Sequence, residues 1–303
     1  MAPHHDHAHE TSAAADPAKL ALALGLIATF MVAEVVVGIL SSSLALLSDA
    51  AHMLTDAAAI ALSLLAVRLA ARPAKGVMTY GLGRAEILSA QVNGITLLVL
   101  GLLIVYEAIR RLVNVPEVDG GPMLATALAG VAVNLAVAAV LARANRRSLS
   151  VEGSYQHIVT DLYAFAATAV AAVVILATGF DRADPIASIL VAVLMFRAAY
   201  ALLKASGRVF LEAAPPGIDP EEIGMALASH PGVAEVHDLH VWEVTSGFPA
   251  LSAHVLVSGG TDCHAKRREL SSLLHERFHI DHSTLQVDHE GADLLTIEDR
   301  RTG

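Results

Sequence analysis

One pair of ionisable residues occurs twice in this sequence at the same spacing. His52 stands four positions before Asp56, and His157 stands four positions before Asp161. Residues four apart share one face of a helix, with Cβ atoms about 5–6 Å apart, so an imidazole nitrogen and a carboxylate oxygen can reach one ion. Two such helices facing each other would offer four nitrogen and oxygen ligands in a tetrahedron, the geometry that zinc prefers. With neutral imidazoles, the charges of the two carboxylates match that of Zn²⁺.

Other polar residues in the same apolar surroundings allow more than one interpretation. The paired residues could serve as interhelical hydrogen bonds or helix caps, but an ionisable residue at mid-membrane costs about 2.5–3.5 kcal/mol, and its repetition favours a metal site. Asp49 shares a helical face with the first pair and fits either a helix cap or a carboxylate on the access path of the ion. For Glu34, Asn93 and Asn134, helix packing or a hydrated lining is favoured over direct ligation.

Long apolar segments must hold these pairs. Of the 303 residues, 55% are hydrophobic and only 17% are charged, and the mean hydropathy is +0.57. A soluble domain carries about 25% charged residues, so much of this chain is expected to lie in a lipid bilayer. Six segments reach the length of about 20 residues that crosses a bilayer. They run approximately over residues 18–40, 44–70, 87–112, 122–142, 151–178 and 185–206.

The sequence therefore predicts six transmembrane helices, with one His/Asp pair on the second and the other on the fifth. The first segment is too long for the apolar core of a cleavable signal peptide. Basic residues crowd the connections on one side, ten against three, and the positive-inside rule then predicts that both termini are cytoplasmic. The ten are Lys19, Arg68, Arg72, Lys75, Arg84, Arg143, Arg146, Arg147, Lys204 and Arg208, and the three are Arg110, Arg111 and Arg182.

The pattern changes after the sixth segment. Two helical segments and three β-rich segments follow in the order αββαβ, which predicts a small α+β domain of the ferredoxin-like kind, with helices on one face of a sheet. Asp219 is the expected cap of the first helix, and Gly247 and Pro249 are expected in the turn between the first two strands. The expected helices cover residues 220–229 and 262–279, and the expected strands cover 236–244, 251–257 and 284–287.

A cluster of histidines lies near the start of the chain. The N-terminal histidines His4, His5, His7 and His9 either capture zinc weakly or reflect composition alone. Cys263 is the one cysteine, so an internal disulfide framework and a cysteine-rich zinc fold are excluded. The chain is thus expected to have four parts: a disordered His-rich tail at 1–17, a transmembrane domain at 18–208, a cytosolic domain at 209–291, and a C-terminal tail at 292–303.

The formal net charge of −10 lies entirely in the last third of the chain. From residue 210 onward there are 6 Lys and Arg against 16 Asp and Glu, whereas the preceding part has 14 of each. Such an acidic segment does not suit nucleic acid or an anionic bilayer surface, which both require basic patches. The segment holds nine histidines and suits cations. Among them, His237 and His240 point to opposite faces of one strand, so only one can share a site with His254 on the neighbouring strand.

Three sequence motifs accompany the repeated His-x-x-x-Asp pair: Leu-Leu-Ser-Asp-Ala-Ala-His-Met-Leu-Thr-Asp at 46–56, Asp-Pro-Ile at 184–186 and His-Asp-Leu-His-Val-Trp at 237–242. With the features described above, they resemble the cation diffusion facilitators, and within them the bacterial zinc exporters. The resemblance extends over about residues 18–288. The family's histidine-rich loop after the fourth span is absent, because residues 143–151 contain no histidine, and the N-terminal cluster could take its place.

The resemblance implies a homodimer in a bacterial inner or plasma membrane that exports Zn²⁺, and often Cd²⁺, from the cytosol in exchange for protons. It also implies that the cytosolic domain at 209–291 serves metal binding and dimerisation. It implies that His52, Asp56, His157 and Asp161 form the transport site, and that zinc is the transported and a regulatory ion, with no catalytic cofactor. Surface histidines without a ligand role are common, so the cytosolic ligands stay open. The resemblance implies them among His237 or His240, His254, His282 and Asp288, with His264 at a second site.

Two other functions fit parts of the pattern. An intramembrane zinc enzyme would keep an open coordination position and a general base, but four ligands close this site and no His-Glu-x-x-His motif occurs. A membrane-bound zinc sensor without transport would need no ligands at membrane depth. The sequence therefore predicts a secondary active transporter and not an enzyme.

Overall fold

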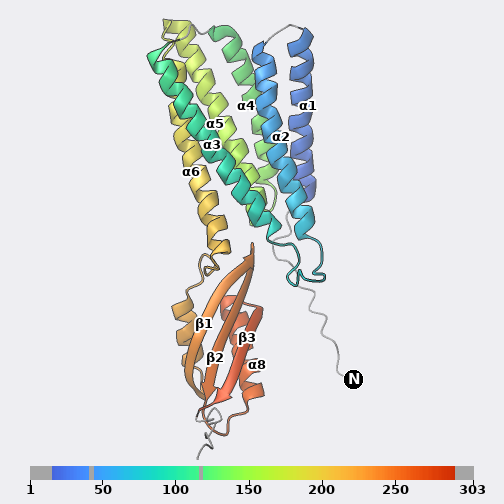
Figure 1. Cartoon of the computed structure of the whole chain (residues 1–303), viewed down its shortest axis with the longest axis vertical. Helices are drawn as coiled ribbons and strands as arrows, with labels where there is room; N and C mark the ends of the chain where they lie inside the picture. The colour runs from blue at the N-terminus through green and yellow to red at the C-terminus, as the bar shows by residue number, and fades with distance from the viewer. Residues whose placement is uncertain (1–15, 41–43, 116–118, 291–303) are drawn as a thin grey trace, which may run out of the picture. The chain divides into compact units, whose positions relative to one another are not determined.

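The computed structural model describes residues 16–40, 44–115 and 119–290. These residues form two compact units: one extends to Arg208 and includes Thr245–Gly247, and the other comprises Val209–Val244 and residues 248–290. The first unit is built from long helices, and the second from two shorter helices and a sheet (Figure 1). The predicted N-terminal histidine cluster and the predicted tail from residue 292 lie outside the described residues.

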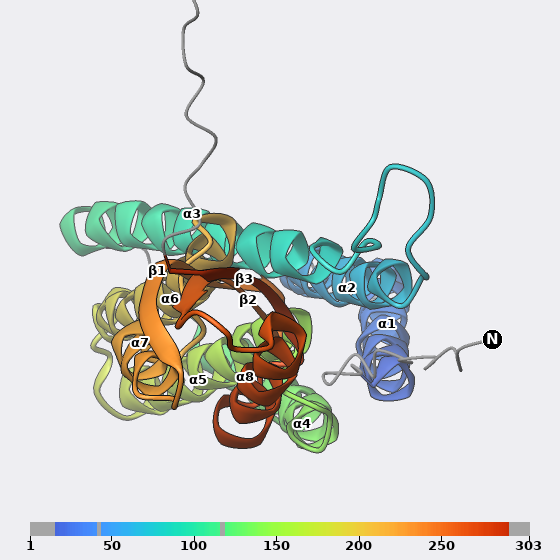
Figure 2. The same cartoon turned by 90° about the horizontal axis from the view of Figure 1, so that it is seen from below.

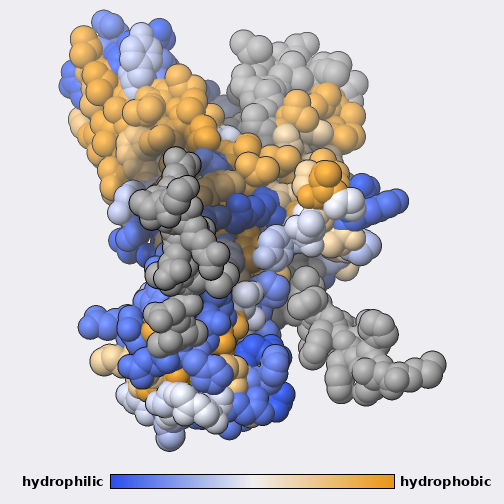
Figure 3. Space-filling model, turned by 60° about the horizontal axis from the view of Figure 1, so that its bottom comes forward, coloured by the Kyte–Doolittle hydropathy of each residue, from blue (hydrophilic) through white to orange (hydrophobic). Residues whose placement is uncertain are grey.

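Six helices make up the described part of the first unit, and their ends lie within four residues of the predicted ones. They are α1 (Pro17–Leu40), α2 (Leu44–Ala70), α3 (Ala85–Val113), α4 (Gly120–Ala142), α5 (Leu149–Thr178) and α6 (Ala183–Phe210). Among the described residues, α3 to α6 are each long and apolar enough to cross a membrane, and α1 contributes a shorter apolar stretch, Pro17–Ala33. Apolar side chains cover much of the helical surface, whereas hydrophilic ones gather over the second unit (Figure 3). The predicted helical membrane protein is confirmed.

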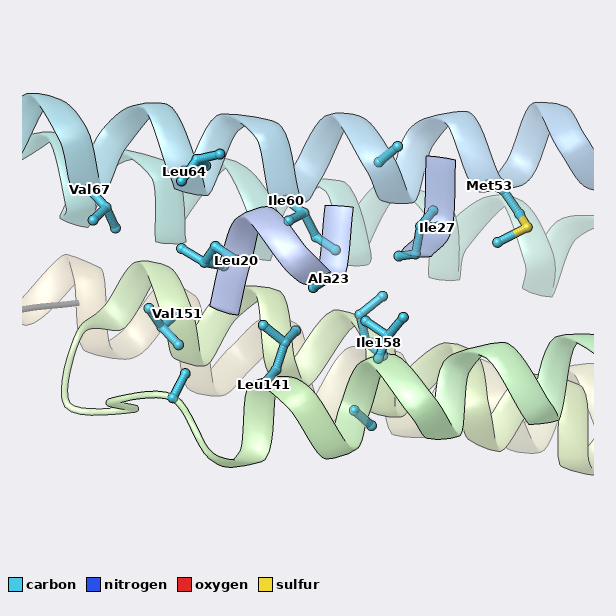
Figure 4. Packing of buried hydrophobic residues seen from close by; sticks show 14 residues of the cluster. Leu20, Ala23, Ile27, Met53, Ile60, Leu64, Val67, Leu141, Val151 and Ile158 are labelled. Atoms are coloured by element: carbon cyan, nitrogen blue, oxygen red, sulfur yellow. The ribbon is translucent and has the colours of Figure 1, made fainter. Parts of the chain in front are cut away.

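Two clusters of apolar side chains form the interior of the bundle. The larger cluster joins α1, α2, α4 and α5, and includes the fully buried Ile27, Ile60 and Ile158 (Figure 4). The smaller cluster joins α3 and α6, through Leu97 and Met195, to the small side chains of α5. Because α5 contributes to both clusters, the helix that carries the second His/Asp pair has protein on more than one side.

Two glycines allow bulky rings to approach neighbouring helices closely. A Cβ atom at Gly130 of α4 would lie 2.4 Å from the Phe165 ring of α5. A Cβ atom at Gly101 of α3 would lie 2.7 Å from the Phe196 ring of α6. Membrane helices associate by close packing of this kind, because lipid supplies no hydrophobic drive between them. A larger side chain at either position would force the ring or the helix to move.

The second unit has the predicted αββαβ order. Its elements are α7 (Pro220–Ala228), β1 (Val233–Thr245), β2 (Phe248–Val257), α8 (Cys263–Phe278) and β3 (His282–His289). Ser246 and Gly247 alone connect β1 to β2, and the φ of +73° at Gly247 suits such a short hairpin loop. Pro249, which was predicted in this turn, lies inside β2 instead.

Both helices of this unit begin at an aspartate. Asp219 caps α7 as predicted, because its carboxylate accepts a hydrogen bond from the Glu221 backbone N–H. Asp262 caps α8 by accepting hydrogen bonds from the backbone N–H groups of His264 and Ala265. These bonds favour the ionised carboxylate, so they hold the pKa of Asp262 below its usual value.

The three strands form one sheet in the order β1–β2–β3. Strands β2 and β3 run parallel, with His254 opposite Gln286, and α8 supplies the crossover that a parallel pair requires. The helices pack on one face of the sheet, as predicted, where Leu251, Val255 and Leu270 are fully buried (Figure 2). Successive side chains of a strand point to opposite faces, so His254 lies on the face away from the helices.

Candidate metal centre

Asp56 of α2 meets His157 and Asp161 of α5 inside the bundle. The His157 Nε2 atom lies 3.0 Å from Asp56 Oδ1 and 3.6 Å from Asp161 Oδ2. Each residue can offer one ligand atom such that the three atoms lie within 4.8 Å of one another. His157 and Asp161 lie close together because their spacing places them on one face of α5. The packing of α2 against α5 brings Asp56 beside them.

These three side chains are closed off from solvent. The exposed fraction is 1% for Asp56 and His157 and 4% for Asp161. Among the described residues, Asp56 Oδ2 and His157 Nδ1 have no hydrogen-bond partner. A buried carboxylate without full hydrogen bonding is costly, and a bound cation offsets that cost. One imidazole and two carboxylates can ligate a divalent ion through nitrogen and oxygen, as in zinc sites. The structure thus brings together three of the four predicted ligands.

The side chains of the other residues predicted for this site lie outside the described residues. They are those of His52, the fourth predicted ligand, and Asp49. His52 stands four positions, about one helical turn, before Asp56 in α2. The side chain of Glu34 in α1 also lies outside the described residues.

Further buried polar side chains lie on α2 to α5, and of these the sequence patterns had indicated Asn93 and Asn134 but not Ser63 or Ser154. Ser154 of α5, three positions before His157, donates a hydrogen bond of 2.7 Å to Ser63 of α2. Asn93 of α3 donates to the same hydroxyl over 3.4 Å, so it takes part in helix packing. Asn134 donates to a carbonyl of its own helix. Ser154 and His157 share one face of α5, but this spacing does not show which side chains of α2 and α3 they meet.

A second group of potential ligands lies on the sheet of the α+β domain. His237 and Asp238 of β1 and His254 of β2 can place one ligand atom each within 4.8 Å of the others. The His237 and His254 ring centroids are 5.3 Å apart, and His254 Nδ1 lies 3.7 Å from Asp238 Oδ2. Asp238 has a φ of +50°, in the left-handed region, which interrupts the alternation of the strand. This break lets two consecutive residues approach the same histidine.

Four other residues predicted as cytosolic ligands do not join this group within the described part of the chain. Gln286 of β3 stands directly opposite His254 in the sheet, so β3 places an amide, and not a histidine or a carboxylate, beside that histidine. The Asp288 carboxylate accepts a hydrogen bond of 2.8 Å from that amide. Of the two histidines of β1, His237 is the one that lies beside His254. The four outside the group are His240, His264, His282 and Asp288.

Both units match known families along most of their length. Residues 20–211 match the cation efflux transmembrane domain, and residues 215–290 match the cytoplasmic domain of cation efflux proteins. The chain therefore belongs to the cation efflux family, and its resemblance to the cation diffusion facilitators is confirmed. Because the members of this family are membrane transporters, the chain is a multi-pass transport protein and not an enzyme.

Three relatives align with nearly the whole chain. The cadmium, cobalt and zinc/H⁺–K⁺ antiporter of Bacillus subtilis (strain 168) is 36% identical over 93% of this chain and 92% of its own. The zinc transporter ZitB of Escherichia coli (strain K12) is 39% identical over 94% of this chain and 93% of its own. The metal cation efflux system protein CzcD of Cupriavidus metallidurans is 36% identical over 94% and 89%. All three names describe transport of metal cations.

Proposed function

We propose that this chain exports Zn²⁺ from the cytosol, in exchange for protons, through Asp56, His157 and Asp161, which we call the transport site. The burial of these three side chains beside one another carries the proposal, because such a group at membrane depth serves an ion. His52, one turn before Asp56 on α2, is the proposed fourth ligand. The names of the relatives support the same class of cargo.

Ligand chemistry favours zinc as the main cargo. Imidazole suits zinc, whereas sites made of carboxylates alone suit harder ions such as manganese. Two imidazoles and two carboxylates also match the four-coordinate geometry that zinc adopts. The Bacillus subtilis relative is named for cadmium as well as zinc, which extends the proposal to Cd²⁺ as a second cargo.

Exchange of one ligand type tests this selectivity. We expect His157→Asp to weaken the preference for zinc over manganese by about tenfold, or about 1.4 kcal/mol, because a carboxylate favours the harder ion. Competition of Mn²⁺ against labelled Zn²⁺ during uptake into vesicles measures the ratio. Thr160→Val, which removes a hydroxyl from the same part of α5, should keep the wild-type ratio. An unchanged ratio in His157→Asp would show that the imidazole does not select the metal.

The orientation and assembly of the protein are part of the same proposal. The excess of basic residues on one side of the bundle favours cytoplasmic termini. The match to the cytoplasmic domain of cation efflux proteins supports a cytosolic C-terminal domain that joins two chains into a homodimer. The bacterial relatives support residence in an inner or plasma membrane.

Zinc flux across a sealed bilayer tests the proposed function. Purified protein in liposomes should carry zinc into the interior at a rate far above that of protein-free liposomes. A membrane-bound zinc sensor would bind zinc equally well but would move none across the bilayer. Zinc binding without flux would therefore contradict the proposed transport and indicate a zinc sensor.

We also propose that His237, Asp238 and His254 bind regulatory zinc in the cytosolic domain. The acidic excess of this domain makes its two copies in a homodimer repel each other, and bound cations offset that repulsion. Metal binding by a folded site also stabilises the fold that holds it. Zinc should therefore draw the two domains together and raise their melting temperature.

Spin labels on Cys263, the one cysteine of the chain, can report the distance between the two domains in the full-length dimer. We expect this distance to shorten when zinc is added and His254→Ala to abolish the change. His275→Ala is the control, because His275 contacts Asp281 and belongs to no predicted ligand group. A normal response in His254→Ala would contradict the ligand role of that histidine.

A further inference from the structure

A buried network of polar side chains joins α2, α3 and α5 on one side of the transport site. Ser154 of α5 donates a hydrogen bond of 2.7 Å to Ser63 of α2. The Ser63 hydroxyl lies 3.3 Å from that of Ser89 and 3.4 Å from the Asn93 amide nitrogen, both on α3. Ser150 of α5 donates to Ser89 over 3.2 Å. These five side chains, which we call the hydroxyl cluster, are all buried, with exposed fractions between 0% and 2%.

The hydroxyl cluster continues the helix faces that carry the transport site. On α5, Ser150 and Ser154 precede His157 by seven and three positions, which keeps all three on one face. On α2, Ser63 follows Asp56 by seven positions, about two turns away. On this side of the site α2 ends, and α3 and α5 begin. The cluster therefore lies between the transport site and one end of the bundle, the cytoplasmic end in the proposed orientation.

A carboxylate stands at the outer edge of the cluster. Glu86, in the first turn of α3, accepts a hydrogen bond of 2.8 Å from Ser148, the residue before α5. Both side chains are buried. From this edge inward, a cation would meet the Glu86 carboxylate, then the hydroxyl oxygens, and then the carboxylate of Asp56. None of the side chains named along this path is basic.

Hydrogen bonds within the cluster join α2, α3 and α5 at this end of the bundle. A hydroxyl group exchanges a bond to protein for a bond to water with little net change in free energy. An apolar seal in the same place would resist wetting, because water gains no such partners from it. Three helices joined by serines can therefore separate, take up water and close again, as a transporter with alternating access requires.

We propose, as an extension of the proposed function, that the hydroxyl cluster is the route by which zinc passes between the cytoplasm and the transport site, closed in this structure by its own hydrogen bonds. The alternative is that these side chains only hold three helices together, as polar residues do in other membrane proteins. The two roles differ in one measurable respect. A route admits water in at least one state of the transport cycle, whereas a helix contact stays dry throughout.

Thiol labelling from the cytoplasmic side distinguishes these roles. In a Cys263→Ser background, Ser154→Cys supplies a single thiol, and inside-out vesicles are treated with a charged, membrane-impermeant methanethiosulfonate reagent. Ser206→Cys is the matched control, because Ser206 is equally buried but donates to carbonyls of its own helix, α6. We expect the thiol in the cluster to react about ten times faster than the control. The reactive form is the thiolate, which forms where water reaches the sulfur and is disfavoured in apolar surroundings.

Labelling of Ser154→Cys should also block zinc uptake by the same vesicles. Ser150→Cys, one turn closer to the cytoplasm, serves as a second variant with the same expected result. Equally slow labelling of both cluster variants and of Ser206→Cys, with zinc uptake intact, would overturn the route and leave transport standing. Labelling only from the opposite side of the membrane would overturn it as well. Zinc uptake of the unlabelled variants is measured separately, so a failure of the proposed function is recognised independently.

Discussion

Zinc transport should fall by about a hundredfold or more when Asp56 is replaced by asparagine. Asparagine keeps the size of the side chain but removes its charge and replaces one oxygen with an amide. Loss of a residue that only supports a metal ligand already costs about 10–100-fold, so loss of a ligand costs more. The Asp56 carboxylate lies 3.0 Å from His157 Nε2, so the substitution removes charge from the centre of the transport site. Zinc uptake by purified protein in liposomes, at matched amounts of folded protein, measures the effect.

A control on α5 separates loss of the site from general damage. Asp161→Asn should behave as Asp56→Asn does, because Asp161 Oδ2 lies 3.6 Å from the same imidazole nitrogen. Thr160 is equally buried, but its hydroxyl donates to the Gln156 carbonyl of its own helix, so Thr160→Val should retain most of the wild-type transport. Near-normal uptake by a folded Asp56→Asn protein would show that Asp56 is not a ligand of the transported zinc.

An imposed pH gradient should drive zinc into vesicles with an acid interior, even against a zinc gradient. Zinc binds only neutral imidazole and ionised carboxylate, so zinc and protons compete for the same atoms. Histidine, with an unperturbed pKa of about 6.5, exchanges its proton within the physiological range. Each exchanged proton should contribute about 1.4 kcal/mol per pH unit, which changes zinc accumulation at equilibrium tenfold. The slope of accumulation against the gradient, measured in inside-out vesicles, then gives the number of protons exchanged.

Two conditions make this experiment decisive. The membrane potential must be clamped, because zinc and protons carry different charges and the potential acts on both. The Bacillus subtilis relative is named for potassium as well as protons, so the potassium gradient should be varied separately. Zinc uptake that does not change with the pH gradient under these conditions would show that the protein is a uniporter and not a zinc/proton exchanger.

Local patterns were sufficient to predict most of the membrane unit. The six helices lie within four residues of their predicted ends, because a bilayer demands about 20 apolar residues and an internally hydrogen-bonded backbone. His157 and Asp161 were predicted to share a face, because four residues make about one helical turn. In the structure both lie beside Asp56 of α2.

The hydroxyl cluster could not be predicted in the same way. Ser63, Ser89 and Ser154 lie on three different helices, and the spacing within one helix says nothing about the neighbours that it meets. A serine inside an apolar segment also costs far less than a carboxylate, so it marks no functional position by itself. The cluster exists only because α2, α3 and α5 pack together.

The cytosolic domain shows the same division between local pattern and tertiary contact. Its αββαβ order followed from the sequence, as did the Asp219 cap. Which histidine of β1 lies beside His254 depended on Asp238, whose positive φ interrupts the strand. Aspartate tolerates the left-handed region without requiring it, so a two-residue strand pattern does not reveal the break. The sequence by itself therefore determined the elements and the chemical groups that they carry. Tertiary structure decided which of those groups meet, because each contact joins residues that are far apart in the chain.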